Sequence, residues 1–177
     1  MSNHNYLSIY AKSFNWAGFF LPKKTYHECS ALYDFCRTID NIADEEDKLD
    51  IKRNNLLNFK NNFINKDYKN SIIKNMWDLI NNFNISQKII NDLFDGVETD
   101  LKERVQLNSK KDLLIYSYRV AGTVGLMMAK ILNVKNKNAL KSAIDLGIAM
   151  QLTNICRDVV EDAQNNRSYI AANFETI

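Results

Sequence analysis

The stretch from Leu146 to Tyr169, LGIAMQLTNICRDVVEDAQNNRSY, carries the pattern that decides the fold class. On an α-helix, at about 100° per residue, its polar side chains fall on one narrow stripe. That stripe consists of Gly147, Gln151, Asn154, Asp158 and Asp162. Apolar residues flank it, and carboxylates in apolar surroundings are costly unless a counter-charge neutralises them. Carboxylate and amide oxygens at this spacing are suited to a hard cation such as Mg²⁺, which commonly shares its ligands with phosphate.

A second stretch, ALYDFCRTIDNIADEED over residues 31–47, repeats the pattern. Its aspartates, Asp40 and Asp44, lie one helical turn apart, and Tyr33 and Arg37 share their face. A single Asp-x-x-x-Asp pair usually marks a solvated helix face. Two such stripes that face each other in a helical protein predict a cavity whose rim binds diphosphate through several metal ions.

Length and composition favour one all-α domain over residues 1–177. The chain has 177 residues, 46% of them apolar, with one proline and five glycines, which favours long helices over a turn-rich β fold.

The net charge of +2 gives no reason to expect nucleic acid as a partner. Only two histidines are present, which argues against a zinc site or a di-iron bundle. We expect a cytoplasmic protein, with peripheral contact at the inner membrane face as an alternative.

Periodicity and capping signals predict the individual helices. These cover residues 5–17, a segment from Leu21-Pro22 to Asp44, residues 51–65 and 70–82, a segment through Asp92–Arg104, and residues 110–132 and 137–165. Breaks with N-caps are expected at Asn84–Ser86 and Asn108-Ser109. Large apolar side chains of the middle segments should form the core or an interface, namely Phe59, Phe63, Met76, Trp77 and Phe83.

A third informative stretch is YSYRVAGTVGLMMAKI, residues 116–131. Small residues share one helical face with a tyrosine there: Tyr118, Ala121, Gly122, Gly125 and Ala129. Each glycine inside a helix costs about 1 kcal/mol relative to alanine, so something must offset that cost. Close helix packing and room for a bulky ligand explain the glycines equally well in isolation. Beside two acidic stripes, we interpret the face as part of an apolar channel that leads to a diphosphate site.

These three stretches together resemble the squalene/phytoene synthase family of head-to-head prenyltransferases, and most closely its bacterial phytoene synthases. The stretch over residues 11–47 is similar to the family's N-terminal segment, and GVETDL at 96–101 is also similar to a stretch of bacterial members. The resemblance implies an isoprenoid-synthase-type helical bundle around a central cavity. It also implies head-to-head condensation of two geranylgeranyl diphosphates to phytoene, through a cyclopropylcarbinyl diphosphate, in carotenoid biosynthesis.

The resemblance also assigns roles to residues. Mg²⁺, or Mn²⁺ as an alternative, would be held by Asp40, Asp44, Asn154, Asp158 and Asp162, and the four aspartates and Tyr118 would be catalytic. The substrate diphosphates and prenyl chains would contact Ser13, Tyr33, Arg37, Ala121, Gly122, Gln151, Asn154, Arg157, Arg167 and Tyr169. We interpret Asp100 as a surface charge rather than a ligand and Tyr116 as a packing residue.

The sequence departs from the family pattern at several positions. Asn41 replaces a second adjacent aspartate, Ala11 replaces a serine, and Ala171 replaces the final proline of the second signature. Family chains continue with several helices beyond the position of Ile177, so we expect those helices to be missing. A fragment, one half of a split protein completed by a second polypeptide, and a degenerate copy are the open explanations.

Two alternative functions follow. A close enzymatic alternative is a squalene- or dehydrosqualene-type synthase that uses farnesyl diphosphate. An alternative of a different class is a non-catalytic family member or inactive fragment that acts as an assembly or binding protein.

Overall fold

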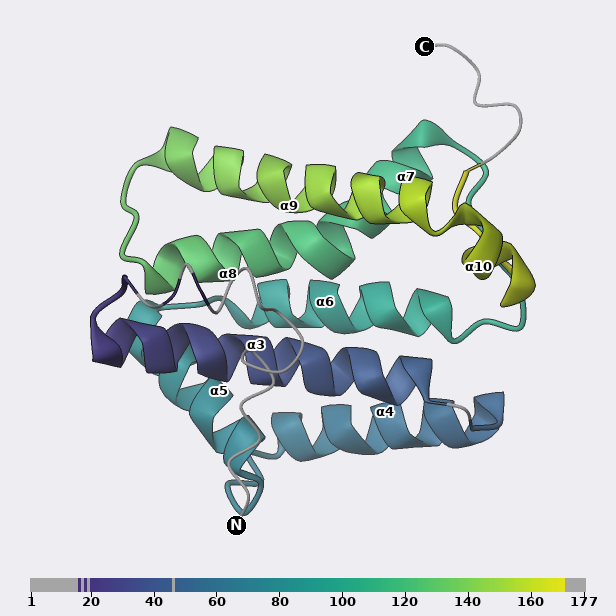
Figure 1. Ribbon diagram of the computed structural model, residues 1–177. Helices are drawn as coiled ribbons and strands as arrows, with labels where there is room; N and C mark the ends of the chain where they lie inside the picture. The colour runs from purple at the N-terminus through teal and green to yellow at the C-terminus, as the bar shows by residue number, and fades with distance from the viewer. Residues whose placement is uncertain (1–15, 17, 19, 46, 171–177) are drawn as a thin grey trace.

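The computed structural model describes residues 16, 18, 20–45 and 47–170, and most of them are helical (Figure 1). The helices are α3 (Lys23–Asp44), α4 (Leu49–Ile64), α5 (Ser71–Phe83), α6 (Gln87–Asp100), α7 (Lys110–Ser117), the π-helix η1 (Tyr118–Gly122), α8 (Thr123–Ile131), α9 (Lys137–Arg157) and α10 (Val159–Gln164). Two short strands, β1 (Val105–Gln106) and β2 (Arg167–Ser168), pair in parallel. The expected all-α class is confirmed, and the small β1–β2 pairing was not predicted.

The residues expected to end and begin the middle helices do so in the structure. Asn84 adopts the left-handed conformation with φ 50° after α5, and the Ser86 hydroxyl accepts from the Lys88 N–H at the start of α6. The Ser109 hydroxyl caps α7 by accepting from the Asp112 N–H. The predicted end of α6 at Arg104 is wrong, because the helix stops at Asp100 and the chain turns into β1. The helix expected over residues 5–17 lies outside the described residues, Trp16 excepted.

Both long helices predicted in the second half of the chain are interrupted. The predicted helix over 110–132 is α7, η1 and α8, with one wider π-turn in the middle. The predicted helix over 137–165 changes direction at Asp158, where φ is −102° and ψ is 14°. Backbone hydrogen bonds continue on both sides, from Asp158 N to Asn154 O and from Asp162 N to Asp158 O. The helical spacing of the apolar residues is therefore kept across Asp158. Periodicity alone cannot predict a change of helix direction at a single residue.

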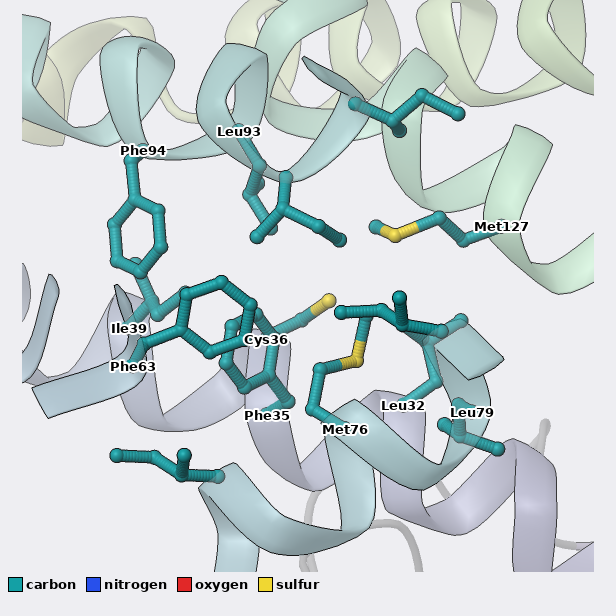
Figure 2. Packing of buried hydrophobic residues seen from close by; sticks show 14 of the residues in the cluster. Leu32, Phe35, Cys36, Ile39, Phe63, Met76, Leu79, Leu93, Phe94 and Met127 are labelled. Carbon is teal, nitrogen blue, oxygen red and sulfur yellow. The ribbon is translucent and has the colours of Figure 1, made fainter. Parts of the chain in front are cut away.

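The main core lies around α3. Four phenylalanine rings from α3, α4 and α6 pack with centroids 5.3 to 6.4 Å apart: Phe35, Phe59, Phe63 and Phe94. Trp77 stacks on one of them and donates its indole N–H to the Phe63 carbonyl at 2.9 Å. Figure 2 shows α5 and α8 closing this cluster through Met76 and Met127. The predicted core residues of the middle helices are buried here, with Phe83 partly buried at the edge.

The arrangement of the helices places three carboxyl ends together. Figure 1 shows α3, α6 and α9 running in the same direction, with α10 and β2 at the end where they finish. α8 packs against both α3 and α9, whereas α6 packs against α3, α8 and η1. Within the described part of the chain, we find no helix that is both long and apolar enough to cross a membrane.

Candidate functional site

The two acidic stretches meet at the end of the molecule where α3 and α6 finish. Asp44 is the last residue of α3, and its Oδ1 lies 3.6 Å from Nη1 of Arg167 in β2. Strand β2 reaches this position because β1 holds it, with hydrogen bonds of 3.1 Å from Val105 N to Asn166 O and from Leu107 N to Ser168 O. An arginine of the second stretch thus faces a carboxylate of the first.

Several helices end on this side of the molecule. The carboxyl end of each helix bears a partial negative charge from its unpaired carbonyl groups. The carboxyl ends of α3, α6 and α9 lie on the same side (Figure 1), and Asp44 and Asp100 are the last residues of two of them. The amino ends of α4 and α10 lie on the same side (Figure 1), so the carboxylates rather than the helix ends attract an arginine or a metal ion here.

The pKa of the Asp40 carboxyl shows that its negative charge is unfavourable at this place. Burial raises the pKa of its carboxyl from 3.8 to about 7, Asp44 raises it further, the Arg37 guanidinium lowers it, and Asp100 raises it. A carboxyl with this pKa lies in a place with less counter-charge than it needs. Asp40, Asp44 and Asp100 therefore form an electrostatic group from two helices.

Asp100 is a residue that sequence reasoning missed. Both oxygens of its carboxylate accept from the Tyr116 hydroxyl at 2.9 Å, and Oδ1 also accepts from the Tyr169 hydroxyl at 2.7 Å. The two tyrosine rings stack with centroids 4.8 Å apart, and each tyrosine is 5% exposed. Burial raises the pKa of Asp100 to about 6, even though both hydroxyls and Arg167 lower it. The interpretation of Asp100 as a surface charge is wrong, because only the folded chain brings Tyr169 to α6. Tyr116 packs in a small core as expected, and its hydroxyl also donates to Asp100.

The aspartates of the second stretch lie differently from those of the first. Arg157 donates to both oxygens of Asp158 at 2.6 Å, and the hydrogen bonds lower the pKa of this exposed carboxyl. Burial raises the pKa of Asp162, and the Arg167 guanidinium lowers it. Asp162 thus lies within electrostatic range of the Arg167 side chain, whereas Asp158 and Arg157 satisfy each other near the surface.

The chemistry of the donor groups fits a hard cation, although the described residues hold no ready-made metal cluster. No three His, Cys, Asp or Glu side chains in the described ranges converge closely enough to hold an ion. The groups at this end are oxygen donors, and burial together with neighbouring carboxylates raises the pKa of Asp40 among them. Asn154 and Gln151, from the last turns of α9, are half-buried.

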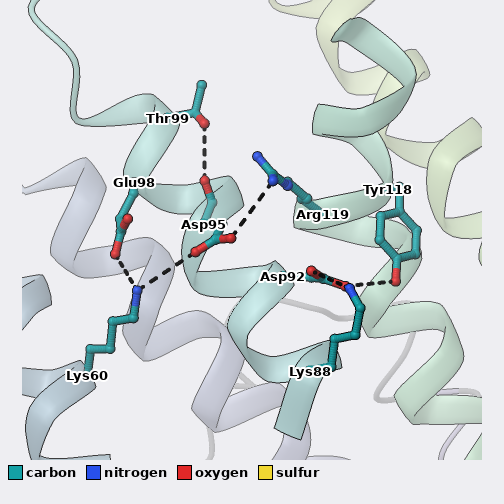
Figure 3. Close-up of polar contacts among 8 residues, drawn as sticks. All are labelled: Lys60, Lys88, Asp92, Asp95, Glu98, Thr99, Tyr118 and Arg119. Carbon is teal, nitrogen blue, oxygen red and sulfur yellow. Dashed lines mark hydrogen bonds and ion pairs between the residues drawn. The ribbon is translucent and has the colours of Figure 1, made fainter. Parts of the chain in front are cut away.

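Tyr118 lies away from this carboxylate group. Its hydroxyl donates to Asp92 Oδ2 at 3.1 Å, and Lys88 pairs with the same carboxylate at 3.4 Å (Figure 3). Asp92 precedes Asp100 by eight residues on α6, about 12 Å along the helix. Asp95 and Glu98 lie between Asp92 and Asp100 on α6. Both pair with Lys60 at the surface, at 3.8 and 2.7 Å (Figure 3). Burial and Asp92 raise the pKa of Tyr118.

The glycines of the third stretch serve close helix packing. A Cβ at Gly147 would collide with the Ala121 carbonyl oxygen, and a Cβ at Gly125 would collide with the Ala143 carbonyl oxygen. The backbone of η1–α8 therefore touches that of α9 directly. Around Gly122 the space is filled by the side chains of Tyr118 and Ile144. The interpretation of Gly125 as room for a ligand is wrong.

The remaining predicted residues are placed as follows. Tyr33 and Arg37 are half-buried on α3, and burial raises the pKa of Tyr33. A surface hollow of about 340 Å³ contains Arg167, Asp162 and Tyr169 in its lining, together with Arg104, which sequence reasoning did not single out. Ser13 lies outside the described residues.

Comparison with known proteins gives a consistent result. The squalene/phytoene synthase pattern matches residues 7–174. A 15-cis-phytoene synthase of Pantoea ananas is 30% identical over 95% of this chain and 58% of that protein. A 4,4'-diapophytoene synthase of Staphylococcus haemolyticus is 32% identical over 95% of this chain and 60% of that protein. A crystal structure of a dehydrosqualene synthase with a ligand matches 93% of this chain and 58% of its own, with a TM-score of 0.68 and 30% identity. The chain thus spans about three fifths of these relatives.

Proposed function

Since this chain belongs to the squalene/phytoene synthase family, we propose that it supplies the diphosphate-binding half of a prenyltransferase that joins two geranylgeranyl diphosphates head-to-head to phytoene. The ion pair between Arg167 and Asp44 is the observation that supports this proposal most directly. It joins the two acidic stretches at the end of the molecule where α3 and α6 finish (Figure 1).

The residues at this end can stabilise a departing diphosphate. Ionisation of an allylic diphosphate breaks the C–O bond, and the pyrophosphate leaves with the electron pair. Arg167 and Arg37 would bind that anion, and Mg²⁺, held by Asp40, Asp44, Asn154, Asp158 and Asp162, would supply further positive charge when bound. The second prenyl double bond then attacks the cation and loses a proton, which forms a cyclopropylcarbinyl diphosphate.

The alternative substrate is farnesyl diphosphate. The structural neighbour is a dehydrosqualene synthase, and one relative is a 4,4'-diapophytoene synthase at 32% identity, slightly above the 30% of the Pantoea ananas phytoene synthase. The diphosphate end is the same for both substrates, because chain length concerns the far end of the prenyl channel.

The channel in this proposal needs further helices against α9. Of the 21 residues of α9 only Gly147 and Ile155 are buried, while Leu146 is 63% and Met150 43% exposed. We infer that additional helices of the kind present in the longer relatives cover this apolar face, supplied by a second polypeptide or by further chain. Peripheral membrane contact completes the proposal, since a C40 hydrocarbon product does not dissolve in water.

Product analysis tests the function. The purified chain is incubated with labelled geranylgeranyl or farnesyl diphosphate, with and without Mg²⁺, alone and with the remaining family helices fused or co-expressed. A Mg²⁺-dependent C40 hydrocarbon supports phytoene synthesis, and a C30 product shifts the assignment to the farnesyl alternative. No product from any combination would overturn the enzymatic proposal in favour of a non-catalytic role.

A further inference from the structure

Asp100, Tyr116 and Tyr169 form a partly buried polar cluster, in which Tyr169, expected to contact the substrate, donates its hydroxyl to Asp100. Two hydroxyls donate to the carboxylate, that of Tyr116 shared between both oxygens and that of Tyr169 to Oδ1, and the two tyrosine rings stack. Val105, Leu107 and Ile155 surround the tyrosines as a second small core, separate from the one around α3. The cluster therefore has one well-defined geometry.

The position of this carboxylate is unfavourable for stability alone. Asp100 ends α6, where the helix dipole opposes a negative charge. Burial and the nearby Asp44 oppose its charge as well. A neutral or cationic side chain at that place would destabilise the fold less. We therefore expect a role of the carboxylate other than stability.

The chain connects this cluster directly to Arg167. Tyr169 follows Arg167 by two residues, directly after the end of β2, and the contacts of both side chains show where they point. Tyr169 and Arg167 therefore project together toward the ends of α3 and α6, Tyr169 onto Asp100 and Arg167 toward Asp44. Tyr116 binds the same carboxylate from α7 and has no such connection to β2.

We propose that Asp100 is a positioning residue, which acts through the Tyr169 hydroxyl to fix β2 so that Arg167 faces Asp44 and the bound diphosphate. The part concerning diphosphate rests on the proposed function, whereas the part concerning β2 rests on the contacts alone. Tyr169→Phe removes the hydroxyl and keeps the ring stack. Tyr116→Phe removes a hydroxyl from the same carboxylate and is the matched control.

Binding of inorganic pyrophosphate with MgCl₂, measured by calorimetry, is the first readout. Tyr169→Phe should weaken pyrophosphate binding about tenfold, and Tyr116→Phe less than about threefold, although both leave Asp100 with one hydrogen-bond donor fewer. In an Arg167→Gln background Tyr169→Phe should add no further loss, because residues that act as one unit are not additive. Equal losses from the two phenylalanine variants, or full additivity with Arg167→Gln, would overturn the proposal.

Amide hydrogen exchange is the second readout and needs no ligand. The Val105 and Leu107 amides, which donate to Asn166 and Ser168, should exchange at least about tenfold faster in Tyr169→Phe than in Tyr116→Phe. If the unaltered chain binds no pyrophosphate, the proposed function fails alone, and this comparison still decides the positioning of β2. Equal exchange in the two variants would refute it.

Discussion

Individual carboxylates at the shared end of α3 and α6 differ in what they contribute, and substitutions can separate them. Asp40 is half-buried and lies near Asp44 and Asp100, whereas Asp158 is near the surface and paired with Arg157. Both are proposed metal ligands, and single substitutions test that assignment.

Asp40→Ala and Asp158→Ala should each abolish turnover, by at least about a hundredfold, because each removes charge that binds the metal and so the leaving diphosphate. The measurement is product formation in the form of the protein that makes product, beside circular dichroism, which should show unchanged helical content. Asp50→Ala, at an 88% exposed carboxylate on α4, is the control and should retain activity. Turnover at the original rate from either site variant would refute the metal assignment.

Asp100 should make the stability of the protein depend on pH. Its carboxyl pKa rises from 3.8 to about 6 on folding, so the folded state binds a proton more readily. The stabilising contribution is complete below about 3.8 and is lost as pH rises through about 6, by at most about 3 kcal/mol. The difference in free energy of unfolding between the unaltered chain and Asp100→Asn should therefore fall between pH 4.5 and 7.5 in urea titrations.

Asp92→Asn is the matched control for loss of a tyrosine–carboxylate hydrogen bond, because Asp92 accepts from Tyr118 on the same helix. A difference between the unaltered chain and Asp100→Asn that stays constant across this pH range would contradict the raised pKa.

At the scale of elements, the crossing of η1–α8 and α9 depends on glycine. Gly147→Ala should lower the free energy of unfolding by about 1–3 kcal/mol, since the added methyl meets the Ala121 carbonyl of the facing backbone. Gly122→Ala meets only side-chain atoms, 3.1 Å away in Tyr118 and 3.2 Å in Ile144, and should stay within about 1 kcal/mol. Urea denaturation compares the two, and equal losses would contradict direct backbone packing.

The exposed apolar face of α9 leads to a second prediction at this scale. Leu146→Lys should change the stability of the chain by less than about 0.5 kcal/mol, because the leucine is 63% exposed. The same substitution should reduce, at least about tenfold, any activity recovered with the remaining family helices. Leu57→Lys, at a 53% exposed leucine on α4, should leave that recovery intact. Equal recovery in both variants would exclude this face as the covered one.

At the scale of the whole molecule, binding of Mg²⁺ with pyrophosphate should raise the stability of the folded chain. Mg²⁺ with inorganic pyrophosphate at about 100 times its dissociation constant should add about 2.7 kcal/mol of stability, visible as a rise in Tm. EDTA should remove most of that rise, and Arg167→Gln should reduce it. A Tm that rises equally with EDTA present would show that metal plays no part in the binding.

The sequence by itself determined the helical class, the family and the two acidic stretches, because these depend on local periodicity and on residue identity at fixed spacing. It also determined the caps at Ser86 and Ser109, which depend on contacts two or three residues away. The interpretation of glycine as ligand space failed at Gly125, which packs against the backbone of Ala143 in the next helix.

Only the tertiary structure decided how the site is assembled. Asp100 and Tyr169 are 69 residues apart, and their contact depends on a two-residue parallel pairing with no periodic signal of its own. The same pairing brings Arg167 to Asp44, from opposite ends of the described chain. Local patterns carry no information about which distant segments meet, and here that meeting determines which carboxylates share a counter-charge.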